Sequence, residues 1–101
     1  MAPHESTGAR TRARELLLQA LYQKQIAGHD FGELLPQFRE QVAYERVDQD
    51  YFEEALAAIC KSQEQLETTI DGVIDRPLEQ LDPVELGVLL IGFYELEMRI
   101  E

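Results

Sequence analysis

The sequence predicts an all-α protein built as a helical bundle, and two observations carry this prediction. Apolar residues recur at steps of three and four through most of the chain, which is the spacing of one helix face. Aspartates precede three of these stretches, at Asp30, Asp48 and Asp82, where a carboxylate can cap the start of a helix. No segment has the apolar–polar alternation of a strand, and no internal repeat has a solenoid period.

Composition indicates a single globular domain. The 101 residues are 45% hydrophobic and 29% charged, which is ordinary for one modest core. No apolar run approaches the roughly 18 residues of a membrane span, and the first residues carry no hydrophobic signal core. The single cysteine, Cys60, excludes an intrachain disulfide, so we expect a cytoplasmic protein. We expect residues 1–9 to form a flexible lead-in to the basic segment and residues 10–101 to form the helical domain.

The first two helices follow from the apolar spacing and from the residues that interrupt it. We expect the first over residues 11–28, because the glycine at its end favours the left-handed conformation found just beyond a helix. Asp30 opens the second, whose apolar stripe continues to Val42. Pro36 conflicts with this pattern, since proline inside a helix costs ~3 kcal/mol. We therefore expect a kink at Pro36 or a helix that effectively begins near Leu35.

Two further helices are expected in the middle of the chain. Asp48 caps the third, and a capping-box pattern at Ser62 and Gln65 predicts a break near Ser62. A fourth helix then continues to Asp75. The Arg-Pro pair at 76–77 ends it, because the residue before proline is driven out of the helical region.

The last helix has the clearest start in the chain. Asp82 supplies a cap, Pro83 stands at the first helical position and Glu85 at the third. The helix that follows, over residues 83–99, is apolar nearly all round, which is typical of a helix at the centre of an assembly. We expect its exposed side to be covered by further chain or by a second copy in a homodimer.

Charge is distributed unevenly along the chain. The net charge of −11 argues against nucleic acid, yet residues 1–25 carry +2 and residues 26–101 carry −13. Arg10 and Arg14 share a helix face and Arg12 points elsewhere. Arginine suits phosphates and guanine edges, and Tyr22, off the apolar stripe, is placed to stack on a base. The alternative is that the arginines are merely solvated. Cations at a helix start oppose its dipole by about 0.3–1 kcal/mol each, which favours a ligand for them.

Catalytic chemistry finds little support in the sequence. There is no glycine-rich phosphate loop, and Cys60 falls on an apolar helix side, where cysteine is usually a small core residue. His4 and His29 lack a ligand partner at metal-binding spacing. Acid pairs such as Glu53 and Glu54 fall on solvated faces. We expect no enzymatic activity, no metal and no cofactor.

Three segments together resemble the NusB family of bacterial antitermination factors. The opening helix of that family is matched by RTRARELLLQALYQKQIAGHD, with its basic cluster followed by A-R-E and Q-A-L-Y. The third family helix is matched by DQDYFEEALAAI. The fifth is matched by VELGVLLIGFYEL, which ends in the Y-E-L motif at Tyr94, Glu95 and Leu96. The resemblance runs from about Arg10 to the end of the chain.

The resemblance implies a fold and a function. NusB-like proteins are two three-helix bundles set roughly at right angles, and they bind the boxA element of ribosomal RNA leader transcripts. They pair with NusE, a protein of the small ribosomal subunit, and join the elongating RNA polymerase complex to suppress termination. Position by position, Arg10, Arg12 and Arg14 match the RNA-binding start. Tyr22 and Glu85 match positions where family members meet RNA or NusE.

The sequence departs from the family pattern at several points. Thr11 stands where a further arginine is common, and Leu86 and Leu90 replace positions that are often basic. Family members continue with two more helices, so we expect the second bundle to be incomplete here. Two alternatives stay open: an accessory domain preceding a ribosomal RNA cytosine methyltransferase, and a purely structural helical dimerisation module.

Overall fold

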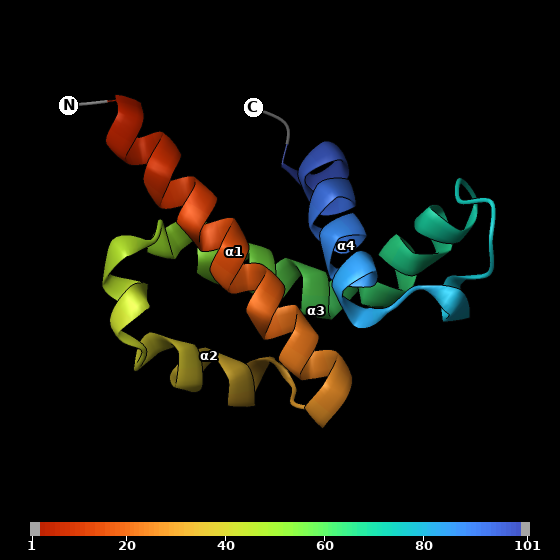
Figure 1. Cartoon of the computed structure of the whole chain (residues 1–101), viewed down its shortest axis with the longest axis horizontal. Helices are drawn as coiled ribbons and strands as arrows, with labels where there is room; N and C mark the ends of the chain where they lie inside the picture. The colour runs from red at the N-terminus through yellow and green to blue at the C-terminus, as the bar shows by residue number, and fades with distance from the viewer. Residues whose placement is uncertain (1–2, 100–101) are drawn as a thin grey trace.

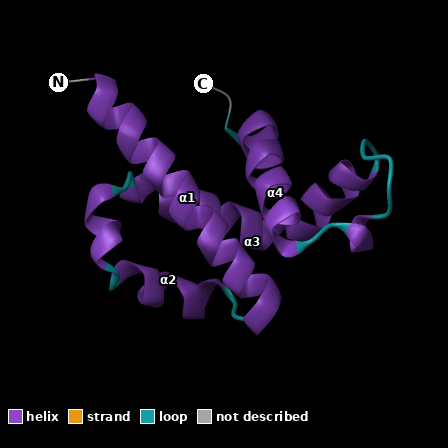
Figure 2. Ribbon diagram, in the orientation of Figure 1, coloured by secondary structure: helices purple, strands orange, loops and turns teal. Residues whose placement is uncertain are grey.

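The computed structural model describes residues 3–99, with side chains from Gly8 onward, and throughout this part of the chain it contains helices and loops without a strand (Figures 1 and 2). The all-α prediction is therefore confirmed. The elements are α1 Pro3–Ala27, α2 Phe31–Arg39, the 3-10 helix η1 Val42–Arg46, α3 Gln49–Asp71, the 3-10 helix η2 Leu78–Gln80 and α4 Pro83–Met98.

The core lies where α1, α3 and α4 pack against one another. In Figure 1, α1 crosses α3, α4 stands on one side of α1, and α2 with η1 lies on the other. Side chains without solvent exposure come from all three helices, including Leu17, Phe52, Leu56 and Leu90. Burying each of these stabilises the fold by about 1.5–3 kcal/mol. None of the described helices is both long and apolar enough to cross a membrane.

Helix α1 starts earlier than the sequence pattern predicts. It begins at Pro3 instead of near Thr11, so residues 3–9, expected to be a lead-in, are helical, while residues 1–2 lie outside the described part. Proline favours the first turn of a helix because its missing N–H has no partner to lose there. The earlier start removes the argument that cations oppose the helix dipole, since Arg10 lies beyond the first turn. Gly28 ends the helix as predicted, with φ at 73° and its N–H donated to the Lys24 carbonyl.

Helix α2 tolerates its internal proline. The Asp30 carboxylate accepts the Glu33 N–H at 2.9 Å, and the Glu33 side chain accepts the Asp30 N–H at 3.0 Å. This capping box and the burial of Leu34 and Phe38 offset the cost of Pro36. The helix therefore starts at its cap, and the predicted start near Leu35 is wrong.

The apolar stripe of α2 does not continue to Val42 as predicted. Val42 lies in η1 and its side chain is 84% exposed, whereas Tyr44, two residues on, is buried. The Tyr44 hydroxyl donates to Glu53, which also accepts two hydrogen bonds from Arg39 at 2.8 and 2.9 Å. Burial, and then the contact with Glu53, raises the pKa of Tyr44 to about 12. These contacts hold the Tyr44 side chain in the core, whereas the Val42 side chain stays exposed.

Helix α3 confirms the predicted break as a kink. The two helices expected in this region form one element, which bends at Ser62, where φ is −112° and ψ is 19°. The Asp48 carboxylate accepts the Tyr51 N–H at 3.1 Å and caps the start. The element ends at Asp71 and not at Asp75, because the N–H of Gly72 closes the last turn on the carbonyls of Thr68 and Thr69.

Helix α4 is buried on one side only. Asp82 and Glu85 form the predicted capping box, and Gly87, Leu90 and Tyr94 face the core. Gly87 marks a close approach to α1, since a Cβ there would lie 2.7 Å from Leu18 Cδ1. The other described helices leave part of this apolar helix uncovered, as the sequence predicts. Val84, Val88, Leu96 and Met98 are its exposed large apolar side chains.

Candidate nucleic-acid interface

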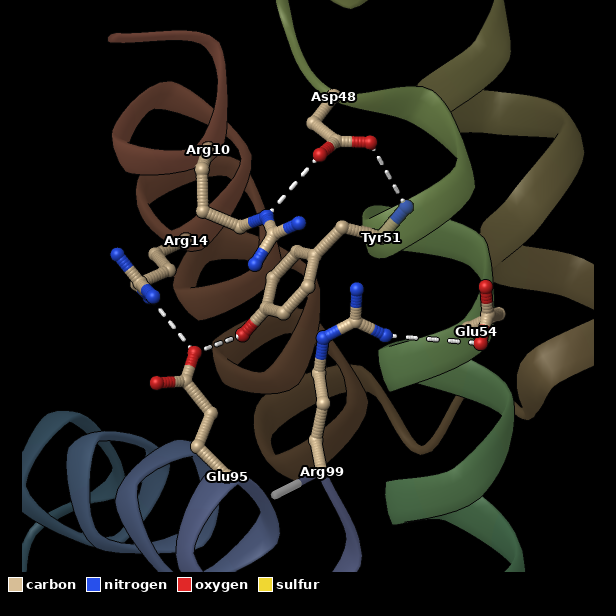
Figure 3. Close-up of polar contacts among 7 residues, drawn as sticks. All are labelled: Arg10, Arg14, Asp48, Tyr51, Glu54, Glu95 and Arg99. Carbon is tan, nitrogen blue, oxygen red and sulfur yellow. Dashed lines mark hydrogen bonds and ion pairs between the residues drawn. The ribbon is translucent and has the colours of Figure 1, made fainter. Parts of the chain in front are cut away.

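Tyr51 lies at the junction of α1, α3 and the end of α4, with its side chain fully buried. Its ring stands between the guanidinium groups of Arg10 and Arg99, whose central carbons lie 4.6 and 5.1 Å from the ring centroid (Figure 3). The guanidinium of Arg14 is 5.7 Å from the same centroid. Each such cation–π contact contributes about 0.5–2 kcal/mol, depending on how far the cation is removed from water.

Three carboxylates balance the three cations around this ring. Arg14 and the Tyr51 hydroxyl both donate to the same oxygen of Glu95, as Figure 3 shows. The ion pairs are Arg10 Nε–Asp48 Oδ2 at 3.0 Å, Arg14 Nε–Glu95 Oε2 at 2.6 Å and Arg99 Nη1–Glu54 Oε1 at 3.6 Å. We call these seven residues, Tyr51 included, the Tyr51 cluster.

The pKa values in the Tyr51 cluster favour the ionised pairs. Burial, and then the hydrogen bond to Glu95, raises the pKa of Tyr51. Burial opposes ionisation of Glu95, but the hydrogen bonds from Arg14 and Tyr51 lower the pKa of its carboxyl below the usual value. Burial has the same opposing effect on Asp48, where the Tyr51 N–H and Arg10 lower the pKa. At neutral pH both carboxylates are therefore charged and Tyr51 remains a hydrogen-bond donor.

Arg12 lies on a different side of α1 from Arg10 and Arg14, as the helical spacing predicts. Its side chain is exposed, and its Nε donates to the carbonyl of Arg46 at 2.8 Å. No carboxylate of the described residues pairs with it. Of the three predicted RNA-binding arginines, Arg10 and Arg14 therefore form ion pairs with carboxylates of other helices, whereas Arg12 is exposed.

Tyr22 lies at the other end of α1, beside the start of α4. Its side chain is 45% exposed and lines an apolar groove of about 500 Å³ together with Ile26 and Val84. Glu85, the next residue after Val84, accepts a hydrogen bond from Arg76 at 2.8 Å. The structure brings the two predicted partner-binding residues to neighbouring elements and separates them from the arginine start.

Sequence reasoning missed the carboxylates and the ring that hold Arg10 and Arg14. Asp48 and Glu95 are 38 and 81 residues away from the arginines they bind. Local periodicity carries no information about such partners. The one available signal is the Y-E-L motif itself, because Glu95 is its central residue.

The described side chains form neither a cluster of metal ligands nor an activated thiol. Within residues 8–99, no three His, Cys, Asp or Glu side chains gather closely enough to hold a metal ion. The side chain of His4 lies outside the described residues, and the His29 ring contacts Gln23 at 3.1 Å. Burial raises the pKa of the half-buried Cys60 thiol, which keeps it in its unreactive protonated form.

Comparison with known proteins identifies the family. The sequence model of the NusB family matches residues 11–101. The chain is 38% identical over 92 residues to a protein of Pseudomonas syringae pv. tomato, 40% over 88 residues to one of Nitrosospira multiformis and 38% over 93 residues to one of Paraburkholderia phymatum. All three are named transcription antitermination protein NusB. These matches cover 91%, 87% and 92% of this chain but 56%, 56% and 64% of the relatives, so the chain spans little more than half their length. The chain belongs to the NusB family.

Proposed function

We propose that this protein is an RNA-binding transcription antitermination factor, and that the arginine-bearing start of α1 is its RNA surface. The observation that carries the proposal is the position of Arg12, an outward-facing guanidinium without a carboxylate partner among the described residues. The relatives that share most of this chain are named antitermination proteins, which supports the same function. Their name favours this proposal over an accessory domain of a methyltransferase.

The RNA contacts follow from the exposure of each arginine. Arg12 meets phosphate directly, while Arg10 and Arg14, whose side chains are 25% and 42% exposed, contact RNA from the edge of the Tyr51 cluster. Tyr22 contributes stacking on an unpaired base. The RNA is a boxA-type element, a single-stranded sequence whose bases are open to such contacts. The acidic remainder of the surface repels other polyanions.

The partner surface is the apolar groove beside Tyr22. Exposed apolar side chains rimmed by polar groups are typical of protein interaction sites. Tyr22 and Val84 supply the apolar contacts, and Glu85, the next residue after Val84, supplies a carboxylate. The partner is NusE, and the pair joins the RNA polymerase elongation complex. The protein acts by binding.

The RNA half is tested by fluorescence anisotropy with a labelled boxA-type RNA, with and without NusE. Binding is expected to strengthen when NusE is added and to weaken with salt, because phosphate contacts release counterions. Replacing Arg10, Arg12 and Arg14 with glutamine should abolish most of the affinity. The RNA half fails if this triple variant, still folded by circular dichroism, binds as the unmodified chain does.

The partner half is tested by a matched pair of substitutions. Tyr22→Asp introduces a charge into the groove, and Val73→Asp introduces the same charge at another exposed apolar residue, 67% exposed and far along the chain. Only the first is expected to weaken NusE binding in a pull-down or calorimetric titration. Equal losses for both variants would contradict the assignment of this groove.

The exposed face of α4 supports a second candidate function, homodimerisation. Val84, Val88, Leu96 and Met98 expose between 42% and 72% of their side chains along this helix. Sedimentation velocity would detect a dimer, and Val88→Glu should dissociate it. A monomer at every accessible concentration would exclude this candidate and leave the antitermination proposal intact.

A further inference from the structure

Most basic side chains in the described part of the chain pair with a carboxylate. Five arginines do so, namely Arg10, Arg14, Arg39, Arg76 and Arg99. Arg12 and Arg46 are exceptions, and they are neighbours in the fold although 34 residues separate them. In a chain with a net charge of −11, two neighbouring arginines that pair with no carboxylate of the described residues form a candidate site for an anionic ligand.

Arg46 is held against α1 by two backbone contacts. The Arg46 carbonyl accepts the Nε of Arg12 at 2.8 Å. Two residues further on, the N–H of Asp48 donates to the Ala9 carbonyl at 3.0 Å, and the Val47 side chain between them is buried. The end of η1 is therefore fixed to the first part of α1 at both sides of Val47. The position of Arg46 relative to Arg12 is set by the fold and not by a loose loop.

The two arginines share a small hollow on the surface. It has a volume of about 130 Å³, with the buried Leu16 and Val47 among its lining residues and the polar Gln19 at its rim. Glu15 also lines it but forms no ion pair with either arginine within the described structure. Arg12 and Arg46 are both exposed, so an anion reaches them without displacing a carboxylate of the described residues.

Arginine pairs of this kind suit a phosphodiester. A guanidinium donates two parallel hydrogen bonds to phosphate oxygens, and a second guanidinium beside it reaches the same group or its neighbour along an RNA strand. The Nε of Arg12 is already used by the Arg46 carbonyl, so its two terminal nitrogens, which lie near Gly8 of the same helix, are the donors left for a phosphate. By contrast, any phosphate approaching Arg14 competes with Glu95.

We propose that Arg46 is a further RNA-contacting residue and that it forms, with Arg12, a two-arginine site for a backbone phosphate of the bound RNA. The inference rests on the proposed RNA-binding function and adds to it a residue outside the basic start of the chain. It also assigns Arg10 and Arg14 a second task, since their ion pairs with α3 and α4 hold α1 so that Arg12 faces Arg46.

The test compares Arg46→Gln with Lys61→Gln. Each substitution removes one positive charge from an exposed side chain, and Lys61 lies on α3, away from the Arg12–Arg46 hollow. In anisotropy titrations with a labelled boxA-type RNA, Arg46→Gln is expected to weaken binding roughly threefold to tenfold and to reduce the salt slope by about 0.7, the value for one phosphate of a single strand. Lys61→Gln should leave both quantities nearly unchanged.

Two further measurements test whether Arg12 and Arg46 act together and whether the bound phosphate belongs to RNA or is a free anion. If both arginines hold one phosphate, the double variant Arg12→Gln/Arg46→Gln should lose less affinity than the product of the two single losses. Titration with inorganic phosphate at constant ionic strength is expected to show no saturable binding at millimolar concentration. Saturable phosphate binding that Arg46→Gln removes, with RNA binding unaffected, would assign the site to a free anion and overturn the proposal.

The remaining outcomes separate this inference from the proposed function. If Arg12→Gln weakens RNA binding and Arg46→Gln does not, the inference is overturned while the proposed function stands. Equal losses for Arg46→Gln and Lys61→Gln would show a general charge effect and overturn it as well. If the unmodified chain binds no RNA even with NusE, the proposed function fails and this inference fails with it.

Discussion

The hydroxyl of Tyr51 donates a hydrogen bond to the carboxylate of Glu95, and this contact joins α3 to α4. The same Glu95 oxygen lies 2.6 Å from the Nε of Arg14 on α1. One carboxylate therefore links the three helices that form the core. Because α1 also carries Arg12, the orientation of the proposed RNA surface depends on this link.

Removing the Tyr51 hydroxyl should destabilise the fold without removing its ring. Tyr51→Phe keeps the cation–π contacts with Arg10 and Arg99 but leaves Glu95 with one donor fewer. A hydrogen bond to a charged group contributes about 1.5–3 kcal/mol, so a loss near the lower value is expected in the free energy of unfolding by urea. Tyr22→Phe is the control, because Tyr22 is 45% exposed. Equal effects of the two substitutions would contradict the role given to the hydroxyl.

Stability should fall in acid through the same carboxylates. The pKa values of Asp48 and Glu95 are lowered in the folded protein from ordinary values of 3.8 and 4.5. Groups with lowered pKa values stabilise the fold fully above the ordinary values, and this stabilisation is lost as the pH falls through the lowered ones. We expect the free energy of unfolding to decline once the pH falls to about these ordinary values and to go on declining below them.

The contribution of Glu95 to this decline can be isolated. Glu95→Gln, although less stable at neutral pH, should show a shallower decline over the acid range than the unmodified chain. Glu97→Gln serves as a control, since Glu97 is an exposed acid on the same helix without an ion pair among the described residues. An unchanged slope for Glu95→Gln would show that its carboxyl has the same pKa in the folded and unfolded states.

Replacing Arg10 should mainly reduce the stability of the fold, whereas replacing Arg12 should mainly weaken RNA binding. Arg10→Gln breaks the pair with Asp48 and the contact with the Tyr51 ring, so a loss of about 1 kcal/mol in unfolding free energy is expected. Arg12→Gln removes an exposed side chain and should change stability by less than about 0.5 kcal/mol. In RNA titrations, the larger loss is expected for Arg12→Gln. Equal stability losses for Arg10→Gln and Arg12→Gln would contradict the distinction between the ion-paired Arg10 and the exposed Arg12.

The sequence predicted the elements that depend on local chemistry. Capping at Asp30 and Asp82, the kink at Ser62 and the end of α1 at Gly28 all follow from interactions within a few residues. The start of α1 was placed too late, because a polar stretch without an apolar stripe gives no periodic signal even where its backbone is helical.

The site was less predictable because its contacts are long-range. The spacing of the arginines correctly separated Arg12 from Arg10 and Arg14, but it gave no sign that two of them bind acids on α3 and α4. The contact between Arg12 and Arg46 was missed for the same reason, since only the packing of η1 on α1 brings the two residues together. The same limit applies to Val42, whose spacing fits a helix that in fact ends before it.

Gly87 on α4 lies close to the Leu18 side chain on α1, so a larger residue there should cost stability. A Cβ at this position would lie 2.7 Å from Leu18 Cδ1, whereas a Cβ at Gly92, on the exposed side of the same helix, would meet nothing within 4 Å. Glycine to alanine gains about 0.5–1 kcal/mol inside a helix, so Gly92→Ala should raise the free energy of unfolding by that amount. Gly87→Ala has the same intrinsic gain but forces the end of the Leu18 side chain to move, so it should raise the free energy of unfolding by less than Gly92→Ala does.

A second substitution at Leu18 makes the Gly87 comparison specific. In Leu18→Ala the clashing methyl group is absent, so adding Gly87→Ala to that background should recover the helix-propensity gain seen for Gly92→Ala. Unfolding by urea, with all variants compared at one pH, gives the coupling between the two positions. Zero coupling would contradict this account, because it would mean that the Leu18 side chain moves aside at no cost in free energy.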